Sequence, residues 1–345
     1  MIPYTRHEIR PEDEAAVLCA LRSGYLTQGP EIEAFEHELA ALSGAKYAVA
    51  VNSGTAALHL TYVAAGWKGR TVHCPAISFV ATSNALIMAK ADPRFVDCNE
   101  EDGLWMESDS PKPCEVPVAL GGQVPEAWGD EIVRDACHGP LTHDAADLAT
   151  CLSLHPAKHI ACGEGGAILT NDDAFAEQCR LLRSHGRRGT EMVSLGYNYR
   201  LNEMSAALGR SQLTRYHAGV AERRRMASRY DDAFAGHYVI QTVPHGPDSA
   251  RHLYQILLPP DGVTYPYLKG RNWAQGKLRE RGIGTAIHYP VIPLQPYYRQ
   301  RYGYREGMFP GAEAHAARTL SIPLFPGLTE AEQDRVIAAV LEVCG

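Results

Sequence analysis

The sequence predicts an α/β fold with a large domain on a mostly parallel sheet and a smaller α+β domain at the C-terminal end. Short apolar runs alternate with amphipathic helical stretches over the first two thirds of the chain, a pattern typical of a parallel sheet with helices on both faces. A length of 345 residues suits one large domain plus a smaller one. The composition changes after a long helical stretch, which divides the chain into predicted domains 1–219 and 220–345.

The expected elements alternate in a regular order along the chain. Strands are expected over 48–51, 71–74, 94–97, 115–119, 132–135, 150–153, 167–170, 237–243, 253–258 and 284–288. Helices are expected over 12–22, 31–42, 56–65, 80–88, 202–234 with a break around 217–219, 271–281 and 329–342. Sheets of this kind bind ligands at the carboxyl ends of their strands. The residues just after 51, 74, 134 and 154 are therefore the first candidates for a site.

Composition excludes several classes of partner and location. The net charge of −7 and the pI of about 6.1 do not favour binding to nucleic acid or to an anionic membrane. No segment approaches the 18 apolar residues of a membrane span, and acidic residues occupy the N-terminal stretch where a signal peptide would be apolar. The nine cysteines are scattered singly without a C-x-x-C pair, which indicates reduced thiols and a cytoplasmic protein.

The loop after the first expected strand has the composition of a phosphate site. Ser53, Gly54 and Thr55 stand between that strand and a helix. Backbone N–H groups at a helix N-terminus, together with the helix dipole, favour a bound phosphate, and the Thr55 hydroxyl adds a donor. When the three residues are considered alone, an ordinary helix cap is the better explanation.

An aspartate ends a later apolar strand. Asp135 closes the run 132–135, where a carboxylate could keep the ring nitrogen of a pyridoxal cofactor protonated. A turn aspartate is the alternative interpretation of the same residue. His138 could line the cofactor or be a loop histidine, and His143 with Asp144 leaves a metal site to consider. No pair of histidines has ligand spacing, so no metal is expected.

A lysine follows the next strand. Lys158 ends the run SLHPAK, which begins at Ser153, and a glycine-rich turn over 163–166 follows. A lysine fixed at the edge of a sheet can form a Schiff base once its pKa is lowered, whereas most lysines are solvated surface charges. Ser153 could donate to a cofactor phosphate. The polar segment between Gly186 and Gly196 suits a loop that reaches away from its own domain.

Five motifs, in order along the chain, resemble those of the DegT-type sugar aminotransferases, which are fold-type I enzymes dependent on pyridoxal 5′-phosphate (PLP). They are SGT at 53–55, DACH at 135–138, SLHPAK at 153–158, EGGA at 164–167 and GYNYRLNE at 196–203. The resemblance covers nearly the whole chain, and ordered motifs are more specific than any one of them. It implies a PLP-dependent nucleotide-sugar aminotransferase of the EC 2.6.1 type that forms a homodimer with shared active sites.

The resemblance also implies roles for individual residues. Lys158 is the catalytic Schiff-base lysine, Asp135 pairs with the pyridine nitrogen, and His138 lies beside the ring. Phe79 stacks on the ring face. The phosphate is held by Gly54, Thr55 and Ser153, with Asn198 reaching it from the neighbouring subunit. The implied substrate-binding residues are Tyr4, Gly24, Tyr25, Leu26, Thr27, His288 and Tyr289.

Further runs resemble the branch of the family that serves the pseudaminic-acid pathway, namely IPY at 2–4, SGYLTQGP at 23–30, RLNE at 200–203, HY at 288–289 and LQPYY at 294–298. That branch aminates a UDP-linked 4-keto-6-deoxy-N-acetylhexosamine at C4, with L-glutamate as the donor, in a ping-pong cycle. The chain departs from the family pattern in its shortened segments 97–135 and 138–153. It also rearranges the usual H-Y-x-P-V order at 288–293. This departure affects the assignment of the sugar substrate more than the assignment of PLP as the cofactor.

Three other functions are weighed against this one. PLP-dependent sugar dehydratases of the same fold replace the lysine by histidine, whereas Lys158 is present here. A non-catalytic regulator that binds PLP or a nucleotide sugar would not need the lysine, the aspartate and the phosphate seat together. A nucleotide-binding oxidoreductase could use the glycine turn at 163–166, but no G-x-G-x-x-G follows an early strand.

Overall fold

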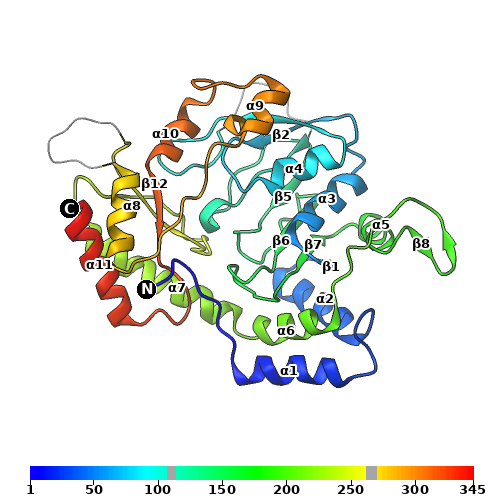
Figure 1. Cartoon of the computed structure of the whole chain (residues 1–345). Helices are drawn as coiled ribbons and strands as arrows, with labels where there is room; N and C mark the ends of the chain where they lie inside the picture. The colour runs from blue at the N-terminus through cyan, green and yellow to red at the C-terminus, as the bar shows by residue number, and fades with distance from the viewer. Residues whose placement is uncertain (107–113, 262–269) are drawn as a thin grey trace.

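The computed structural model describes residues 1–106, 114–261 and 270–345. A seven-stranded sheet runs through the larger part of the molecule (Figure 1), with the order β1-β7-β6-β5-β4-β2-β3. From one edge to the other the strands are β1 (Tyr47–Val51), β7 (Gly166–Thr170), β6 (Ala149–Ser153), β5 (Glu131–Asp135), β4 (Cys114–Glu115), β2 (Thr71–Pro75) and β3 (Asp92–Val96). Only β7 runs antiparallel to its neighbours in this sheet. The predicted mostly parallel α/β sheet is thereby confirmed.

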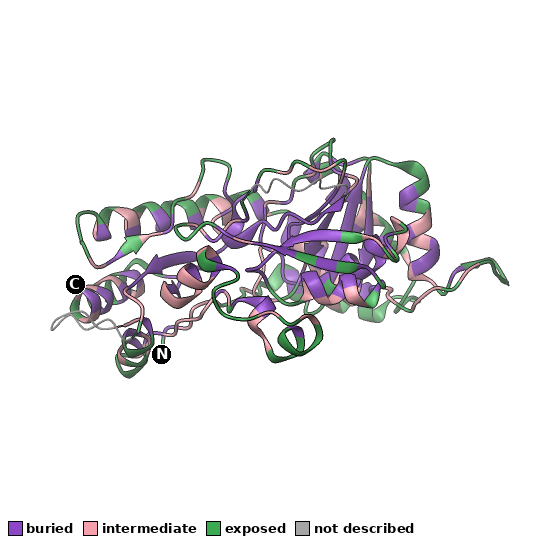
Figure 2. Ribbon diagram, turned by 90° about the horizontal axis from the view of Figure 1, so that it is seen from above, coloured by how far each residue is buried: buried purple, intermediate pink, exposed green. Residues whose placement is uncertain are grey.

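Helices cover both faces of this sheet (Figure 1). One face packs against α3 (Gly54–Ala64), α4 (Ala81–Met88) and α5 (Asp173–Arg183). The other face packs against α2 (Pro30–Ser43) and α6 (Glu203–Leu213), with α1 (Pro11–Arg22) lying outside α6. Alternate side chains of β1 point to opposite faces, so Val49 and Val51 join the first core cluster while Ala48 and Ala50 join the second. The strands are therefore buried on both faces, as Figure 2 shows.

The C-terminal part has its own antiparallel sheet. It is formed by β10 (Gln241–Thr242), β11 (Tyr254–Leu257) and β12 (Thr319–Ile322). The helices of this part are α7 (Tyr216–Phe234), α8 (Arg271–Glu280), α9 (Pro296–Tyr302), α10 (Pro310–Arg318) and α11 (Glu330–Cys344). A third core cluster gathers side chains from α7, α8, α11 and this sheet together with Ile2. The division of the chain at residue 219 stays a prediction, and Tyr298 and Phe309 pack in the core of the large sheet.

Four predicted elements differ in the structure. Of the strand expected over 237–243, only Gln241–Thr242 forms. Of the strand expected over 115–119, only Cys114–Glu115 forms a continuous ladder, and Val118 makes a single further bridge to Asp135. Pro117 cannot donate to a ladder, and a 3-10 turn follows at Leu120–Gly122. The stretch 284–288 forms no strand, since it pairs briefly with Ile2 through Gly284 and then with Ser321 through Ala286. The long helix breaks between Leu213 and Tyr216, slightly earlier than expected.

A short hairpin extends away from the body of the molecule. Its strands are β8 (Arg187–Arg188) and β9 (Glu191–Met192), and it projects beyond α5 in Figures 1 and 2. Met192 and Leu195 expose most of their surface there. In the described part of the chain, no helix is long and apolar enough to cross a membrane.

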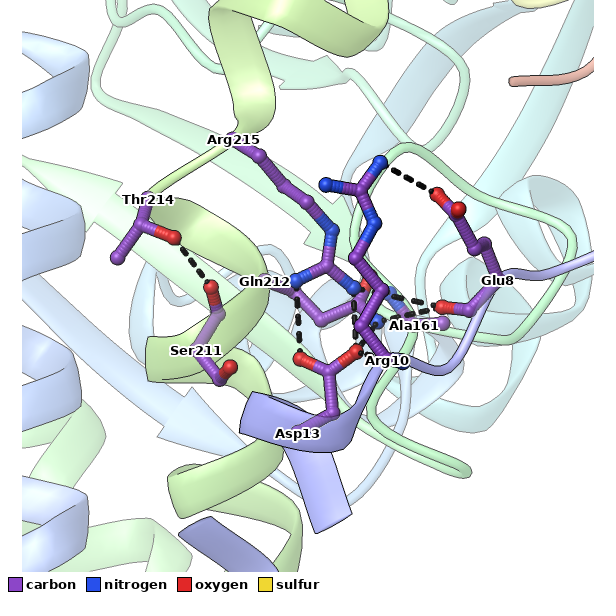
Figure 3. A network of polar contacts seen from close by, with 8 residues as sticks. All are labelled: Glu8, Arg10, Asp13, Ala161, Ser211, Gln212, Thr214 and Arg215. Atoms are coloured by element: carbon purple, nitrogen blue, oxygen red, sulfur yellow. Dashed lines mark hydrogen bonds and ion pairs between the residues drawn. The ribbon is translucent and has the colours of Figure 1, made fainter. Parts of the chain in front are cut away.

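A buried polar network fixes the N-terminal helix (Figure 3). Asp13 of α1 is fully buried and accepts hydrogen bonds on both carboxylate oxygens from Arg215, which lies between α6 and α7. The Gln212 amide donates to Asp13 at 3.2 Å and to the carbonyl of Glu8 at 3.0 Å. The carbonyl oxygen of the same amide accepts from the backbone N–H of Ala161 at 3.5 Å. The network therefore joins α1 to the segment that follows Lys158.

We predict that Asp13→Ala lowers the free energy of unfolding by about 3–5 kcal/mol, because it leaves the partly buried Arg215 guanidinium unpaired. Although burial acts to raise the pKa of Asp13, the hydrogen bonds from Arg215 and Ser211 lower it overall. The stabilisation from this carboxylate is therefore present above its unfolded pKa and is lost as the pH falls through the lowered folded pKa. Urea unfolding at several pH values measures both effects.

The matched control is Arg225→Ala, because Arg225 and Glu330 form an exposed ion pair. Such pairs contribute little, so this variant should unfold nearly like the wild type. Equal stabilities of the Asp13 and Arg225 variants would contradict the assignment of a structural role to the network.

Candidate active site

A cavity of about 420 Å³ opens at the carboxyl ends of β5 and β6, beside the N-terminus of α3. Ten of the residues predicted from the sequence line it together: Tyr4, Gly54, Thr55, Phe79, Asp135, His138, Ser153, Lys158, His288 and Tyr289. They come from segments scattered over the whole chain, and both parts of the molecule contribute. The location agrees with the expectation that ligands bind at strand ends.

One wall of the cavity is built to receive an anion. The Ser53 side chain caps α3 by accepting from the backbone N–H of Ala56 at 3.0 Å. The N–H groups of Gly54 and Thr55 have no acceptor among the residues that the structure describes. A side chain at Gly54 would put its Cβ 2.8 Å from the Cβ of Ser153 and 3.2 Å from the sulfur of Cys137. Glycine is therefore required here, and the open N–H groups suit a phosphate.

Asp135 ends β5 with its carboxylate held in place. Its Oδ2 accepts from the Thr82 hydroxyl at 2.7 Å, and its Oδ1 accepts from the backbone N–H of Cys137 at 3.1 Å. The residue is almost fully buried. A buried carboxylate with fixed orientation can hold a proton on a heterocyclic nitrogen facing it.

Lys158 lies in a tight loop that follows β6. The loop is held by the hydrogen bond from the Lys158 N–H to the carbonyl of His155 at 2.8 Å and by two bonds that join Leu154 to Gly165 and Cys162. Loss of hydration lowers the pKa of Lys158 to about 8, although the nearby Cys137 and Asp135 act in the opposite direction. The neutral amine, which is the nucleophilic form, is thus accessible near neutral pH.

The C-terminal part closes the cavity with rings. The Tyr289 hydroxyl and Nε2 of His138 lie 3.0 Å apart, which joins the two parts of the molecule across the site. The ring centroids of Phe79 and Tyr289 are 5.9 Å apart, and those of Tyr4 and His288 are 5.6 Å apart. Burial and the charge of Lys158 lower the pKa of His138 well below its ordinary value and that of His288 to about 4. Both histidines are therefore neutral near pH 7.

These features fit PLP. The phosphate seat suits its phosphate, the Lys158 amine its aldehyde, Asp135 its ring nitrogen and Phe79 a ring face. Nδ1 of His138 is buried without a partner in the described part of the molecule, so it remains available to a ligand. No group of three or more His, Cys, Asp or Glu side chains that could hold a metal occurs among the described residues.

Five predicted residues lie outside this cavity. Asn198 is exposed at the base of the hairpin, where it bridges to Ser184. Gly24, Tyr25, Leu26 and Thr27 lie on the exposed loop between α1 and α2. The buried carboxylate of Glu203 fixes the end of that loop by accepting from the N–H groups of Gly29 and Glu31, both at 2.9 Å. The contribution of Asn198 and of residues 24–27 to a binding site remains a prediction.

Sequence reasoning missed several residues of the site. Cys137, His155 and Glu164 line the cavity, although the sequence predicts no individual role for them. Thr82 contacts Asp135 from α4, and no local pattern indicates that contact. His252 lies beside His138, with ring centroids 4.4 Å apart and the rings tilted by 42°. The only available signal for Thr82 was its position in the run SFVAT, three residues after Phe79.

Comparisons with known proteins agree with this geometry. The model of the DegT/DnrJ/EryC1/StrS aminotransferase family matches residues 7–109 and 122–341. The spore coat polysaccharide biosynthesis protein SpsC of Bacillus subtilis (strain 168) is 32% identical over 377 aligned residues, covering 99% of this chain and 97% of SpsC. The structure of S. venezuelae DesV matches with a TM-score of 0.89 and 30% identity, covering 99% of this chain and 98% of DesV. Helicobacter pylori PseC, an aminotransferase involved in the biosynthesis of pseudoaminic acid, matches with a TM-score of 0.88 and 27% identity over 99% of both chains.

Proposed function

The chain belongs to the DegT/DnrJ/EryC1/StrS aminotransferase family, and on that premise we propose that it transfers an amino group from L-glutamate to C4 of a UDP-linked 4-keto-6-deoxy-N-acetylhexosamine. It is a sugar aminotransferase of the EC 2.6.1 type, and its cofactor is PLP. The observation that carries the proposal is an amine of lowered pKa, Lys158, in one cavity with Asp135 and a phosphate seat.

Lys158 is proposed to attach the cofactor and to move protons. When bound, PLP withdraws electrons from the carbon that carries the transferred nitrogen. Because its pKa is about 8, the Lys158 amine can accept a proton from the donor Cα and later deliver one to the sugar carbon. A single base at this position serves both halves of a ping-pong cycle, and the buried Asp135 carboxylate stabilises positive charge at the ring nitrogen.

The finer assignment of the sugar rests on two kinds of support. The runs at 2–4, 23–30, 288–289 and 294–298 resemble the pseudaminic-acid branch of the family, and Helicobacter pylori PseC matches over nearly the whole chain. Tyr4, His288 and Tyr289 contribute aromatic rings to the lining of the cavity, which suits the sugar ring. A sugar dehydratase is disfavoured because Lys158 stands where those enzymes have histidine. A non-catalytic regulator is disfavoured because Lys158, Asp135 and the phosphate seat are all present in one cavity.

The partner and location belong to the same proposal. We propose a homodimer in which Asn198 of one chain reaches the phosphate site of the other, since Asn198 lies outside its own cavity at the base of a projecting hairpin. Met192, Val193 and Leu195 expose apolar surface on that hairpin, as expected of a segment that another chain covers. Nine free cysteines support a cytoplasmic location.

The function is tested by offering the purified protein PLP, L-glutamate and a panel of UDP- and other nucleotide-linked keto sugars. We expect 2-oxoglutarate and a product whose mass shows the ketone replaced by an amine, for the UDP-linked 4-keto-6-deoxy-N-acetylhexosamine above all. Lys158→Ala should lose both the visible absorption of the bound cofactor and the product, whereas Lys68→Ala, at an exposed position, should retain both. Full turnover by Lys158→Ala would exclude the assigned role, and a preference for another sugar would replace the proposed substrate.

Sharing of the site between chains is tested by mixing two inactive variants. Lys158→Ala chains and Asn198→Ala chains are unfolded together, refolded and assayed. If Asn198 serves the neighbouring chain, each mixed dimer contains one intact site, and an equal mixture should recover about a quarter of wild-type activity. If Asn198 acts within its own chain, the mixture should stay as inactive as the separate variants.

A further inference from the structure

Thr82 makes the shortest side-chain contact to Asp135. It lies in the first turn of α4 with 1% of its surface exposed, and its Oγ1 is 2.7 Å from Oδ2 of Asp135. The other carboxylate oxygen accepts from the backbone N–H of Cys137 at 3.1 Å. Each oxygen of the carboxylate therefore has one donor from the protein, and the plane of the carboxylate is fixed from two sides.

The direction of the hydrogen bonds follows from chemistry. An ionised carboxylate has no proton to give, so Thr82 must donate to Asp135. The Thr82 oxygen can then accept from the hydroxyl of Ser78, which lies 3.1 Å away and is equally buried. The carbonyl oxygen of Phe79, 3.0 Å from the Ser78 hydroxyl, is the competing acceptor. The result is a chain of donors that runs from Ser78 through Thr82 to Asp135. Hydrogen bonds aligned in this way strengthen one another in a buried environment.

We propose that Thr82, oriented by Ser78, is a positioning residue that holds the Asp135 carboxylate in the orientation required to keep the ring nitrogen of PLP protonated. The inference rests on the proposed role of Asp135 and adds to it a residue that acts through that carboxylate. Thr82 does not line the cavity. It is therefore expected to act through Asp135 and not by contacting the cofactor directly.

The helix that carries Thr82 is itself anchored, so the contact is part of a rigid arrangement. Tyr298 of α9 donates to the Ser83 hydroxyl at 2.8 Å or to the Asn84 side-chain oxygen at 2.7 Å. Ser83 is as buried as Thr82, but its hydroxyl faces Tyr298 instead of Asp135. Thr82 and Ser83 are therefore neighbours on one helix with different partners. The Thr82 hydroxyl contacts the Asp135 carboxylate, whereas the Ser83 hydroxyl contacts only Tyr298 of the surrounding fold.

The other titratable groups near Asp135 are Tyr62 of α3, Tyr289, the loop residues Cys137 and Lys158, and Cys151 of β6. Burial raises the pKa of Tyr289 well above neutrality. Burial and the charge of Asp135 raise the pKa of Tyr62 and of both thiols far above neutrality. Burial lowers the pKa of Lys158 to about 8, and in the loaded enzyme this amine is proposed to be bonded to PLP. A titration of the bound cofactor therefore reports on the cofactor and Asp135, without interference from these neutral side chains.

The experiment compares Thr82→Val, which removes the hydroxyl and keeps the shape, with Thr82→Ser, Ser78→Ala and the control Ser83→Ala in the PLP-loaded enzyme. Two quantities are measured: the pH midpoint at which the visible absorption of bound PLP changes, and the dissociation constant of PLP. A protonated ring nitrogen disfavours a second positive charge on the same conjugated system. A poorly positioned carboxylate should therefore raise the midpoint, by about one pH unit in Thr82→Val, and weaken PLP binding roughly tenfold.

Thr82→Ser should restore both wild-type values, and Ser78→Ala should shift the midpoint in the same direction by a smaller amount. Ser83→Ala should keep the wild-type midpoint even where it lowers stability. The inference is overturned if Thr82→Val shows the wild-type midpoint, or if Thr82→Val cannot be purified and Ser78→Ala shows it. Asp135→Asn separates the two claims: an unchanged midpoint in that variant would remove the proposed role of Asp135, whereas a shift there with none in Thr82→Val removes only the role of Thr82.

Discussion

The structure depends on holding an amine and a carboxylate close together where both have lost most of their water. Each charge would be costly to bury alone, and their attraction offsets part of that cost. At Lys158 the loss of hydration prevails over the attraction of Cys137 and Asp135, so the pKa of the amine falls to about 8. A reactive neutral amine at the end of β6 is the consequence, and the chemistry of the family requires one.

The remainder of the fold keeps this arrangement fixed. Gln212 joins the segment after Lys158 to the buried Asp13 network, and Thr82 with the Cys137 backbone fixes the carboxylate of Asp135. Tyr289 reaches His138 from the C-terminal part.

Much of this site could be predicted because its residues lie where strands end. The alternation of apolar runs identified β1, β5 and β6, and the residues after them proved to share one cavity. Contacts between distant segments could not be predicted in the same way. Thr82 approaches Asp135 only through the packing of α4, and the stretch 284–288 divides its hydrogen bonds between two partners instead of forming a strand. Asn198 lies at the base of a hairpin directed away from its own cavity, so one chain cannot reveal its role.

The central claim, that burial makes Lys158 a reactive neutral amine near physiological pH, is tested most directly by competitive labelling. Protein freed of PLP is treated with a trace of acetic anhydride across a range of pH, and mass spectrometry compares the acetylation of Lys158 with that of exposed Lys68. Because only the neutral amine reacts, labelling of Lys158 should rise with pH and reach half its maximum near pH 8. A labelling curve for Lys158 that coincides with the curve for Lys68 would contradict the account.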